Sequence, residues 1–378
     1  MFGGAEKALI NMLHYFDYSK YDVTLWLKDG SGEMQDQVDP RVRIEYWGSR
    51  LTQGFGTHCS TLLKKGNLPR IAKSLFFRFQ SRLFVNNWHK NFKYHIKSLA
   101  PFSSETYDAA ISFHSLVRDD TMILSYALKS KMRIGWIHGM CKHDLSNEYF
   151  KPFRTEYGRM HRIFCVSNAV KESFLSVYPQ FEKKVSVMYN LHRFDRIREL
   201  AACSVDIDLD ILTFTTVGRL SEEKGQELIP FVAKKLLDKG YSFVWYLVGD
   251  GGTRSRIEDS IRRLGIGEYV KLIGNRVNPY PFIKNCTVYV QTSAYEGFGL
   301  TIWEAVLLDK RVVTTDAPVI HEMHLEEACI ICKLTEDDLA DGIIKALDMP
   351  RNSGRSIIDF NDDYNYSELK KLYQQIGD

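Results

Sequence analysis

The chain has 378 residues, enough for two domains that each bury a core of their own. Its composition, 44% hydrophobic and 26% charged, is ordinary for a globular protein, and the lack of any uncharged apolar run of ~18 residues argues against a transmembrane helix. Residues 1–6 resemble neither a signal peptide nor a lipidation signal, so we expect a cytoplasmic protein.

The seven cysteines are odd in number and scattered, mostly in apolar, strand-like segments such as residues 163–166. This pattern predicts reduced thiols. Cys329 and Cys332 are the one close pair, and no second Cys or His pair lies nearby at zinc spacing. We therefore predict no metal site.

The net charge of +3 conceals a basic segment, because no acidic residue occurs between Glu45 and Glu105. Within it, helical spacing puts an apolar stripe of Phe84, Trp88, Phe92 and Ile96 opposite Lys90, Lys93 and Lys97. Two interpretations stay open: residues 70–97 contact an anionic membrane surface, or the helix buries its stripe in the core. No nucleic-acid motif accompanies the charge, so we expect no nucleic-acid partner.

Helical and strand-like patterns alternate in the first half, which predicts a parallel sheet covered by helices. An insertion at about residues 51–98 interrupts it, and residues 51–69 have loop character. The predicted helices are 5–16, 120–128, 150–159 and 168–177, and the predicted strands are 21–27, 42–47, 108–113, 132–138, 162–167 and 184–190.

The pattern lapses over residues 191–210, which we predict to be an interdomain linker, and the D-x-D matches within 206–210 are taken as chance. A second α/β series follows, with strands at 212–219, 242–249, 270–274, 288–293, 311–315 and 328–333, and helices at 226–239, 253–264, 280–284, 300–308 and 336–347. We predict two doubly wound, Rossmann-like domains, residues 1–195 and 196–355, with a cleft between them, and a C-terminal helical segment, 356–378, that packs back across both.

Two carboxylates eight residues apart, Glu296 and Glu304, bracket the junction between a buried strand and a helix. Free N–H groups at the helix start attract phosphate, and Gly297 and Gly299 let the backbone approach it. The carboxylates can accept hydrogen bonds from hydroxyl groups. This stretch therefore predicts a ligand site, although exposed acids at a helix start would show the same pattern.

Other polar residues also follow predicted strands. Arg219 ends one strand and Lys224 lies five residues later, an arrangement suited to a diphosphate. His138 ends another strand, where a lone histidine is more often structural than catalytic. Gly4 precedes the first helix, where close approach to an anion is again favoured. Residues 249–252 lack the spacing of a dinucleotide fingerprint.

Together these motifs resemble, in sequence order, those of family 4 retaining glycosyltransferases with the GT-B fold. Bacterial members that build capsule, O-antigen or other surface polysaccharides are the most similar in character. The matching segments are residues 3–6, 136–139, 165–168, 187–190, 217–225, 248–251 and 296–304. Members of that family usually begin with a strand before the residues that correspond to Gly3–Glu6, so we expect the first sheet to lack a strand.

The resemblance implies the roles of individual residues. Arg219 and Lys224 would hold the donor diphosphate, Glu296 the donor-sugar hydroxyls and Glu304 the ribose. His138 would lie on the acceptor side near the sugar C6. The remaining donor contacts would come from Asn275 near the base, from Gly4 in the opposite domain, and from the backbone of Gly297, Phe298, Gly299, Leu300 and Thr301.

The expected activity is retaining transfer of a sugar from a UDP- or GDP-linked donor to a glycan or lipid-linked acceptor, without an essential metal. The enzyme would be cytoplasmic or peripheral on the inner face of the plasma membrane. Two alternatives share the fold: a nucleotide-sugar 2-epimerase, which needs no acceptor, and a noncatalytic subunit of an assembly complex.

Overall fold

The computed structural model describes residues 3–32, 34–52, 54–116, 118–141, 153–205, 207, 210–349 and 362–377. Contacts divide the chain into two compact units. The N-terminal unit comprises residues 8–190 and 366–378, and the C-terminal unit comprises residues 1–7 and 191–365. Residues 1–7, which we predicted in the N-terminal domain, thus group with the C-terminal unit.

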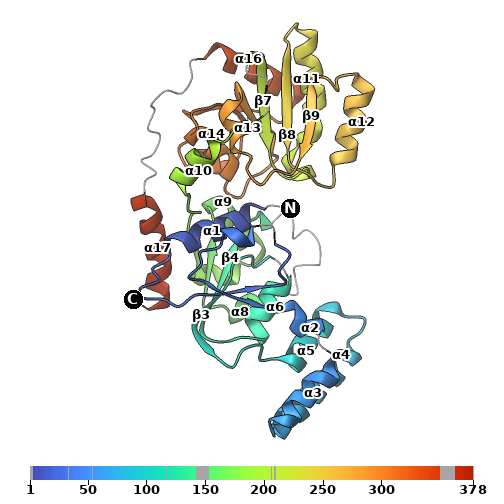
Figure 1. Ribbon diagram of the computed structural model, residues 1–378, viewed down its shortest axis with the longest axis vertical. Helices are drawn as coiled ribbons and strands as arrows, with labels where there is room; N and C mark the ends of the chain where they lie inside the picture. The colour runs from blue at the N-terminus through green and yellow to red at the C-terminus, as the bar shows by residue number, and fades with distance from the viewer. Residues whose placement is uncertain are drawn as a thin grey trace. The chain divides into compact units, whose positions relative to one another are not determined.

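The C-terminal unit is built on a parallel sheet with the strand order β12-β11-β10-β7-β8-β9 (Figure 1). The chain moves outward from β7 to β9, then returns to the other side of β7 with β10. Adjacent β7 and β10 therefore form the switch point of a doubly wound sheet, where ligands bind beyond the carboxyl ends of strands. The strands are β7 Leu212–Val217, β8 Phe243–Val248, β9 Val270–Gly274, β10 Val288–Gln291, β11 Arg311–Thr315 and β12 Cys329–Cys332.

Helices cover this sheet and close its core. Val232, Ile257 and Ile343, from α11, α12 and α16, join Trp245 and Val290 of the sheet in one buried apolar cluster. Outside that cluster, α13 and α14 pack on each other and on β7 and β11. The helices are α10 Phe194–Ala201, α11 Ile229–Asp238, α12 Arg254–Leu264, α13 Tyr280–Asn285, α14 Leu300–Leu307, α15 Pro318–Glu322 and α16 Glu336–Asp348.

The predicted linker at residues 191–210 contains a packed helix, so that prediction was wrong. Helix α10 buries Phe194, Ile197 and Ala201 and contacts α13. The Leu200 carbonyl accepts a 2.8 Å hydrogen bond from Asn278 Nδ2. Four charged residues among eight disguise the short amphipathic pattern. Two aspartates of the D-x-D matches, at positions 206 and 208, lie outside the described residues.

The N-terminal unit holds a four-stranded parallel sheet, β3-β4-β5-β6, and a two-stranded one, β1-β2 (Figure 1). We predicted a gap in the first sheet, and in the described part of the chain these two sheets share no strand pair. The strands are β1 Thr24–Leu27, β2 Arg43–Tyr46, β3 Thr106–Ser112, β4 Lys129–Ile137, β5 Arg162–Cys165 and β6 Val185–Val187. The accompanying helices are α1 Gly4–Tyr15, which starts in residues of the C-terminal unit, α6 Arg118–Tyr126, α8 Arg154–Arg159, α9 Asn168–Val177 and α17 Asp362–Ile376.

The C-terminal helix α17 is tied to the N-terminal unit from Tyr366 onward. The Tyr189 N–H donates to Glu368 Oε2 at 2.9 Å, and the Asp17 N–H donates to the Tyr373 hydroxyl oxygen at 2.8 Å. The predicted helix at 150–159 is described only from Phe153 onward.

Most described residues of the insertion lie in helices joined by short turns, so the predicted loop at 51–69 was wrong. Asn67 and Asn87 cap two of its helices, accepting hydrogen bonds from the N–H groups of Arg70 and Lys90. Phe84 therefore follows the end of one helix, and the predicted stripe is split between two. The four helices are α2 Gly48–Thr52, α3 Phe55–Lys64, α4 Leu68–Leu83 and α5 Trp88–Leu99.

The stripe on α5 packs inward, which is the second of the two interpretations above. Ile96 is buried, and the Trp88 ring lies 6.2 Å from that of Phe153. Lys93 and Lys97 place their Nζ atoms 5.2 and 5.3 Å from the Tyr126 ring centroid. No described helix has the length and apolar character needed to cross a bilayer.

Candidate functional site

The candidate site lies at the switch point of the C-terminal sheet. After β7 the chain forms a short 3-10 turn, Glu222–Lys224, and after β10 it forms the loop that contains Glu296. Because β7 and β10 are hydrogen-bonded neighbours, both segments leave the same edge of the sheet. The fold thereby brings together Lys224 and Glu296, which are 72 residues apart.

Glu296 is the centre of a buried polar network. Lys224 Nζ lies 2.8 Å from each carboxylate oxygen of Glu296. The Glu296 Oε1 atom also accepts hydrogen bonds from Gln291 Nε2 at 3.0 Å and from Ser293 Oγ at 2.6 Å. The Glu296 side chain is 6% exposed and that of Lys224 22% exposed. Two neutral donors and one cation thus hold the carboxylate in a single orientation.

Backbone contacts lock the two loops together. The Ala294 N–H donates to the Glu223 carbonyl at 2.8 Å, and Thr292 Oγ1 donates to the Lys224 carbonyl at 2.9 Å. Gly225, which follows Lys224, has φ +63°. Its backbone lies so close to Thr292 that an added Cβ would be 2.2 Å from the Thr292 carbonyl oxygen. Any side chain at position 225 would therefore displace the turn that carries Lys224.

Glu304 belongs to a second cluster, on the first turns of α14. Gly299, with φ +73°, is the N-cap that turns the loop into this helix. Lys7 Nζ lies 2.5 Å from Glu304 Oε1, and the Tyr280 hydroxyl donates to the same oxygen at 3.5 Å. Glu304 Oε2 is buried without a hydrogen-bond partner among the described residues. Within the described part of the chain, one oxygen of this buried carboxylate is thus left without a donor.

Burial and the close Lys7–Glu304 contact have opposing effects on the pKa values of this second cluster. Removal from water raises the pKa of Glu304, although Lys7 and Tyr280 oppose the shift. Burial alone would lower the pKa of Lys7, but attraction to Glu304 and Tyr280 raises it overall. At 2.5 Å from the cation the carboxylate forms an ion pair with Lys7. Such a pair contributes little net stability, and breaking it would leave a buried charge.

The loop between the two carboxylates is well packed. Phe298, Gly299 and Leu300 are buried, whereas Gly297 and Thr301 are partly exposed. A Cβ added to Gly4 would lie 3.3 Å from Leu300 Cδ1, so residue 4 lies beside the start of α14. The Phe298 ring lies 5.8 Å from that of His192. Of the predicted donor residues, Gly4 and the loop are therefore close together.

Arg219 and Asn275 are placed differently from this group. The exposed Arg219 guanidinium lies 3.9 Å from Glu223 Oε1. Asn275 is exposed after β9, the edge strand, which is separated from β7 by β8. The structure therefore pairs Lys224 with Glu296, while Arg219 lies beside Glu223, four residues further along the chain.

His138 belongs to the N-terminal unit. Its ring lies 4.7 Å from that of Phe113 and 6.2 Å from that of His114. Burial, together with the neighbouring His114, lowers the pKa of His138 to about 3. The imidazole is therefore neutral at physiological pH, with an Nε2 atom that is buried and has no partner among the described residues.

Four residues of the two clusters were not among the predicted site residues: Gln291, Ser293, Lys7 and Tyr280. A signal existed for Gln291, because a glutamine in a strand buried on both faces needs an internal partner. Lys7 and Tyr280 had none, since each is far from Glu304 in the sequence. No group of three His, Cys, Asp or Glu residues suited to a metal occurs in the described part of the chain.

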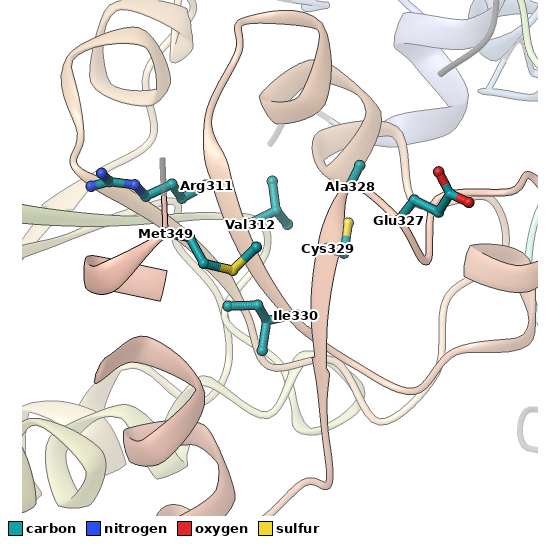
Figure 2. A pocket seen from close by; sticks show the side chains of 7 residues that line it. All are labelled: Arg311, Val312, Glu327, Ala328, Cys329, Ile330 and Met349. Carbon is teal, nitrogen blue, oxygen red and sulfur yellow. The ribbon is translucent and has the colours of Figure 1, made fainter. Parts of the chain in front are cut away.

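A shallow hollow lies beside β11 and β12 (Figure 2). Its lining includes none of the predicted site residues and is mostly apolar, so we assign it no function. The lining residues are Arg311, Val312, Glu327, Ala328, Cys329, Ile330 and Met349.

Residues 204–360 match the family model described as Glycosyl transferases group 1. An uncharacterized glycosyltransferase of Methanocaldococcus jannaschii is 27% identical over 151 residues, 39% of this chain and 37% of that protein. The N-acetylgalactosamine-N,N'-diacetylbacillosaminyl-diphospho-undecaprenol 4-alpha-N-acetylgalactosaminyltransferase of Campylobacter jejuni is 29% identical over 134 residues, 35% of each chain. The alignments thus span little more than a third of these curated relatives.

The likeness to solved structures covers the whole chain. The Anabaena protein HepE, solved in complex with UDP and glucose, aligns with a TM-score of 0.62 over 99% of this chain and 96% of its own. Its sequence is 17% identical, so this comparison establishes the fold.

Proposed function

The chain has the GT-B fold that its sequence predicted and a group 1 glycosyl transferase domain over residues 204–360, and from this premise we propose that it is a retaining, family 4-like glycosyltransferase. It transfers a sugar from a UDP- or GDP-linked donor to a glycan or lipid-linked acceptor. The observation that carries the proposal is the Lys224–Glu296 pair at the switch point. A buried carboxylate for hydroxyls beside a cation for phosphate is what a nucleotide-sugar site requires.

In this proposal the first cluster binds the reacting end of the donor. Glu296 accepts hydrogen bonds from the sugar hydroxyls. Lys224 contacts the diphosphate, and the N–H groups of residues 297–301 donate hydrogen bonds to the same group. Arg219 leaves Glu223 to reach the same diphosphate; its exposed side chain leaves that movement free. Gly4 lies beside Leu300, and its lack of a side chain lets the backbone approach the donor closely.

The second cluster binds the nucleoside end. The unpartnered Glu304 Oε2 accepts a hydrogen bond from a ribose hydroxyl, which satisfies the buried oxygen. Asn275 contacts the base, and His138 the acceptor side near the sugar C6. A neutral His138 suits this role, because it can accept or donate one hydrogen bond without carrying charge.

Catalysis then depends on stabilising the leaving group. Negative charge develops on the departing diphosphate, and Lys224, Arg219 and the N–H groups at the start of α14 stabilise it. Both carboxylates have binding roles, so we assign no covalent nucleophile. The acceptor attacks from the side of the leaving phosphate, which takes the acceptor proton, and configuration is retained. No essential metal is proposed.

The acceptor is proposed from the chemistry of a relative. The name of the Campylobacter jejuni protein describes transfer to a glycan on undecaprenol diphosphate. This supports a lipid-linked acceptor here, in the synthesis of a bacterial surface polysaccharide such as capsule or O-antigen. Such an acceptor would require peripheral contact with the inner face of the plasma membrane.

The test begins with a screen of nucleotide sugars for thermal stabilisation of the full chain, since a ligand stabilises the state that it binds. With the donor identified, Glu296→Ala and Lys224→Ala should each lower turnover at least a hundredfold, whereas the exposed Lys239→Ala should not. Unchanged turnover in the first two variants would contradict the assignment. Product formation without an acceptor would indicate the 2-epimerase, and donor binding without turnover the noncatalytic subunit.

A further inference from the structure

Large apolar side chains are exposed mainly in one part of the N-terminal unit. Of twelve exposed large hydrophobic residues in the described chain, seven lie between positions 63 and 85 and are 53% to 72% exposed. They are Leu63, Leu68, Leu75, Phe76, Phe79, Leu83 and Val85. Such concentrated apolar exposure is unusual for a monomeric protein and marks an interaction surface.

Most of these side chains share one face of α4, which we call the α4 apolar face: Leu68, Leu75, Phe76, Phe79 and Leu83. Their spacing of 7, 8, 11 and 15 residues from Leu68 places them within an arc of about 100°. The helix has 16 residues, so the face extends about 24 Å. This length is enough for several side chains to enter one surface together.

The amphipathic pattern of α4 is inverted. The helix buries Ser74 and Ser81 on its opposite side, which packs on α3 and α5. Ser74 Oγ lies 3.4 Å from His58 Nε2 of α3, and the Ser81 carbonyl accepts a 2.8 Å hydrogen bond from Asn91 of α5. Because the polar side of α4 is the one that packs on α3 and α5, the apolar face is left outside the core. Figure 1 shows α3, α4 and α5 grouped together, away from β3 and β4.

Cations border the α4 apolar face. Lys73 lies beyond one edge of the arc and Arg82 beyond the other, and both are exposed. Lys64 and Lys65, at the end of α3, are exposed as well. No acidic residue occurs from position 46 to 104. Long basic side chains that flank an apolar helical face are typical of helices lying in the headgroup layer of anionic membranes.

We propose that the α4 apolar face inserts into the headgroup layer of an anionic lipid bilayer. The cations beside it would contact lipid phosphates: Lys73, Arg82, Lys64 and Lys65. A second copy of the chain would be a poor occupant, because it would bring these cations together without an acidic partner. The sequence left open whether residues 70–97 contact a membrane. This proposal places the contact on α4, because Lys93 and Lys97 of α5 lie over the Tyr126 ring and Ile96 is buried. The inference deepens the proposed function by naming where a lipid-linked acceptor is met.

Flotation of the full chain with vesicles tests this inference. The protein should bind vesicles of phosphatidylcholine with 30 mol% phosphatidylglycerol, and bind pure phosphatidylcholine much less. The triple variant Leu75→Gln/Phe76→Gln/Phe79→Gln should lower partitioning at least tenfold, because three apolar insertions are lost. Lys73→Glu/Arg82→Glu should lower it more than tenfold, since each cation near an anionic surface contributes about fivefold.

Matched controls keep the test decisive. Val277→Gln and Leu334→Gln remove exposed apolar side chains from the C-terminal unit and should leave binding unchanged. All altered side chains are exposed, so the melting temperature should stay within a few degrees. Binding that survives the triple variant, or no binding to any vesicle, overturns the inference. So does a concentration-dependent dimer that the triple variant abolishes, since the face would then join two copies.

The outcome is separable from that of the proposed function. Turnover of the donor with a water-soluble acceptor should be the same in the triple variant and the unaltered chain. If the unaltered chain transfers the sugar but does not bind vesicles, only the proposal of a membrane-binding surface is refuted. Vesicle binding without any sugar transfer would refute only the glycosyltransferase assignment.

Discussion

Lys224 Nζ lies 2.8 Å from both carboxylate oxygens of Glu296, across 72 residues of sequence. The two residues meet because β7 and β10 are neighbours at the switch point of the sheet. The side chain of Glu296 is buried and that of Lys224 is largely buried, so water cannot fully replace the contact that each charge makes with the other. In the proposed function, this pair would place a cation and a carboxylate beside the same ligand.

The strength of this pair can be measured by a double-mutant cycle. Lys224→Met should lower the free energy of unfolding by about 2 kcal/mol, because it leaves a buried carboxylate with neutral donors only. Lys224→Met/Glu296→Gln should cost less than the sum of its single changes by about 1 kcal/mol. Urea unfolding measures both quantities. The exposed pair Lys239–Asp341, altered to Met and Asn, should show almost no coupling, and equal coupling in the two cycles would contradict a special role for the buried pair.

Ser293 orients Glu296 through a 2.6 Å hydrogen bond. In Ser293→Ala the carboxylate keeps Lys224 and Gln291 but loses one restraint. We expect kcat/KM for the donor to fall about tenfold, which corresponds to about 1.4 kcal/mol. Steady-state kinetics with the identified donor measure the change. Ser176→Ala, which removes a hydroxyl in the N-terminal unit, is the control, and an equal loss there would show that the effect is unspecific.

Lys7 compensates the buried charge of Glu304, so Lys7→Met should be strongly destabilising. An unpaired carboxylate in this position should cost about 3 kcal/mol in the free energy of unfolding. Lys7→Met/Glu304→Gln removes both charges and should recover most of that loss. Urea unfolding at pH 7 of the three proteins tests the prediction. If the double variant is as unstable as Lys7→Met, packing of the lysine chain rather than charge explains the loss.

His192 should make stability depend on pH. Burial, with a smaller effect of Lys7, lowers the pKa of His192 to about 3, whereas an unfolded chain has a value of about 6.5. Between these values the unfolded state binds a proton that the folded state does not. Folding stability should therefore fall as the pH falls below about 6.5, by up to about 1.4 kcal/mol per pH unit.

The comparison with His192→Phe isolates this contribution. The variant keeps an aromatic ring beside Phe194 and Phe298 but cannot titrate. Urea unfolding at intervals from pH 8 to pH 4.5 should show parallel curves above pH 7 and a steeper decline for the unaltered chain below pH 6. Identical slopes over the whole range would show that folding does not lower the pKa of His192.

The α/β alternation could be predicted because it depends on local patterns. β9, β11 and α9 begin and end at the predicted residues, and α14 begins at the predicted Leu300. The errors arose where the local signal was weak. Helix α10 has only three buried side chains among many charges, and α3 buries none, so neither shows the apolar repeat on which prediction relies.

The sequence by itself determined the two α/β series with parallel sheets, the junction at Glu296 and Glu304, and the basic character of the insertion. Tertiary structure alone decided the partners: Lys224, Gln291 and Ser293 for Glu296, and Lys7 and Tyr280 for Glu304. It also decided that α5 packs inward while α4 exposes leucine and phenylalanine. The physical reason is common to both, since periodicity reveals that a helix has an apolar face, whereas only the neighbouring elements determine whether that face is covered.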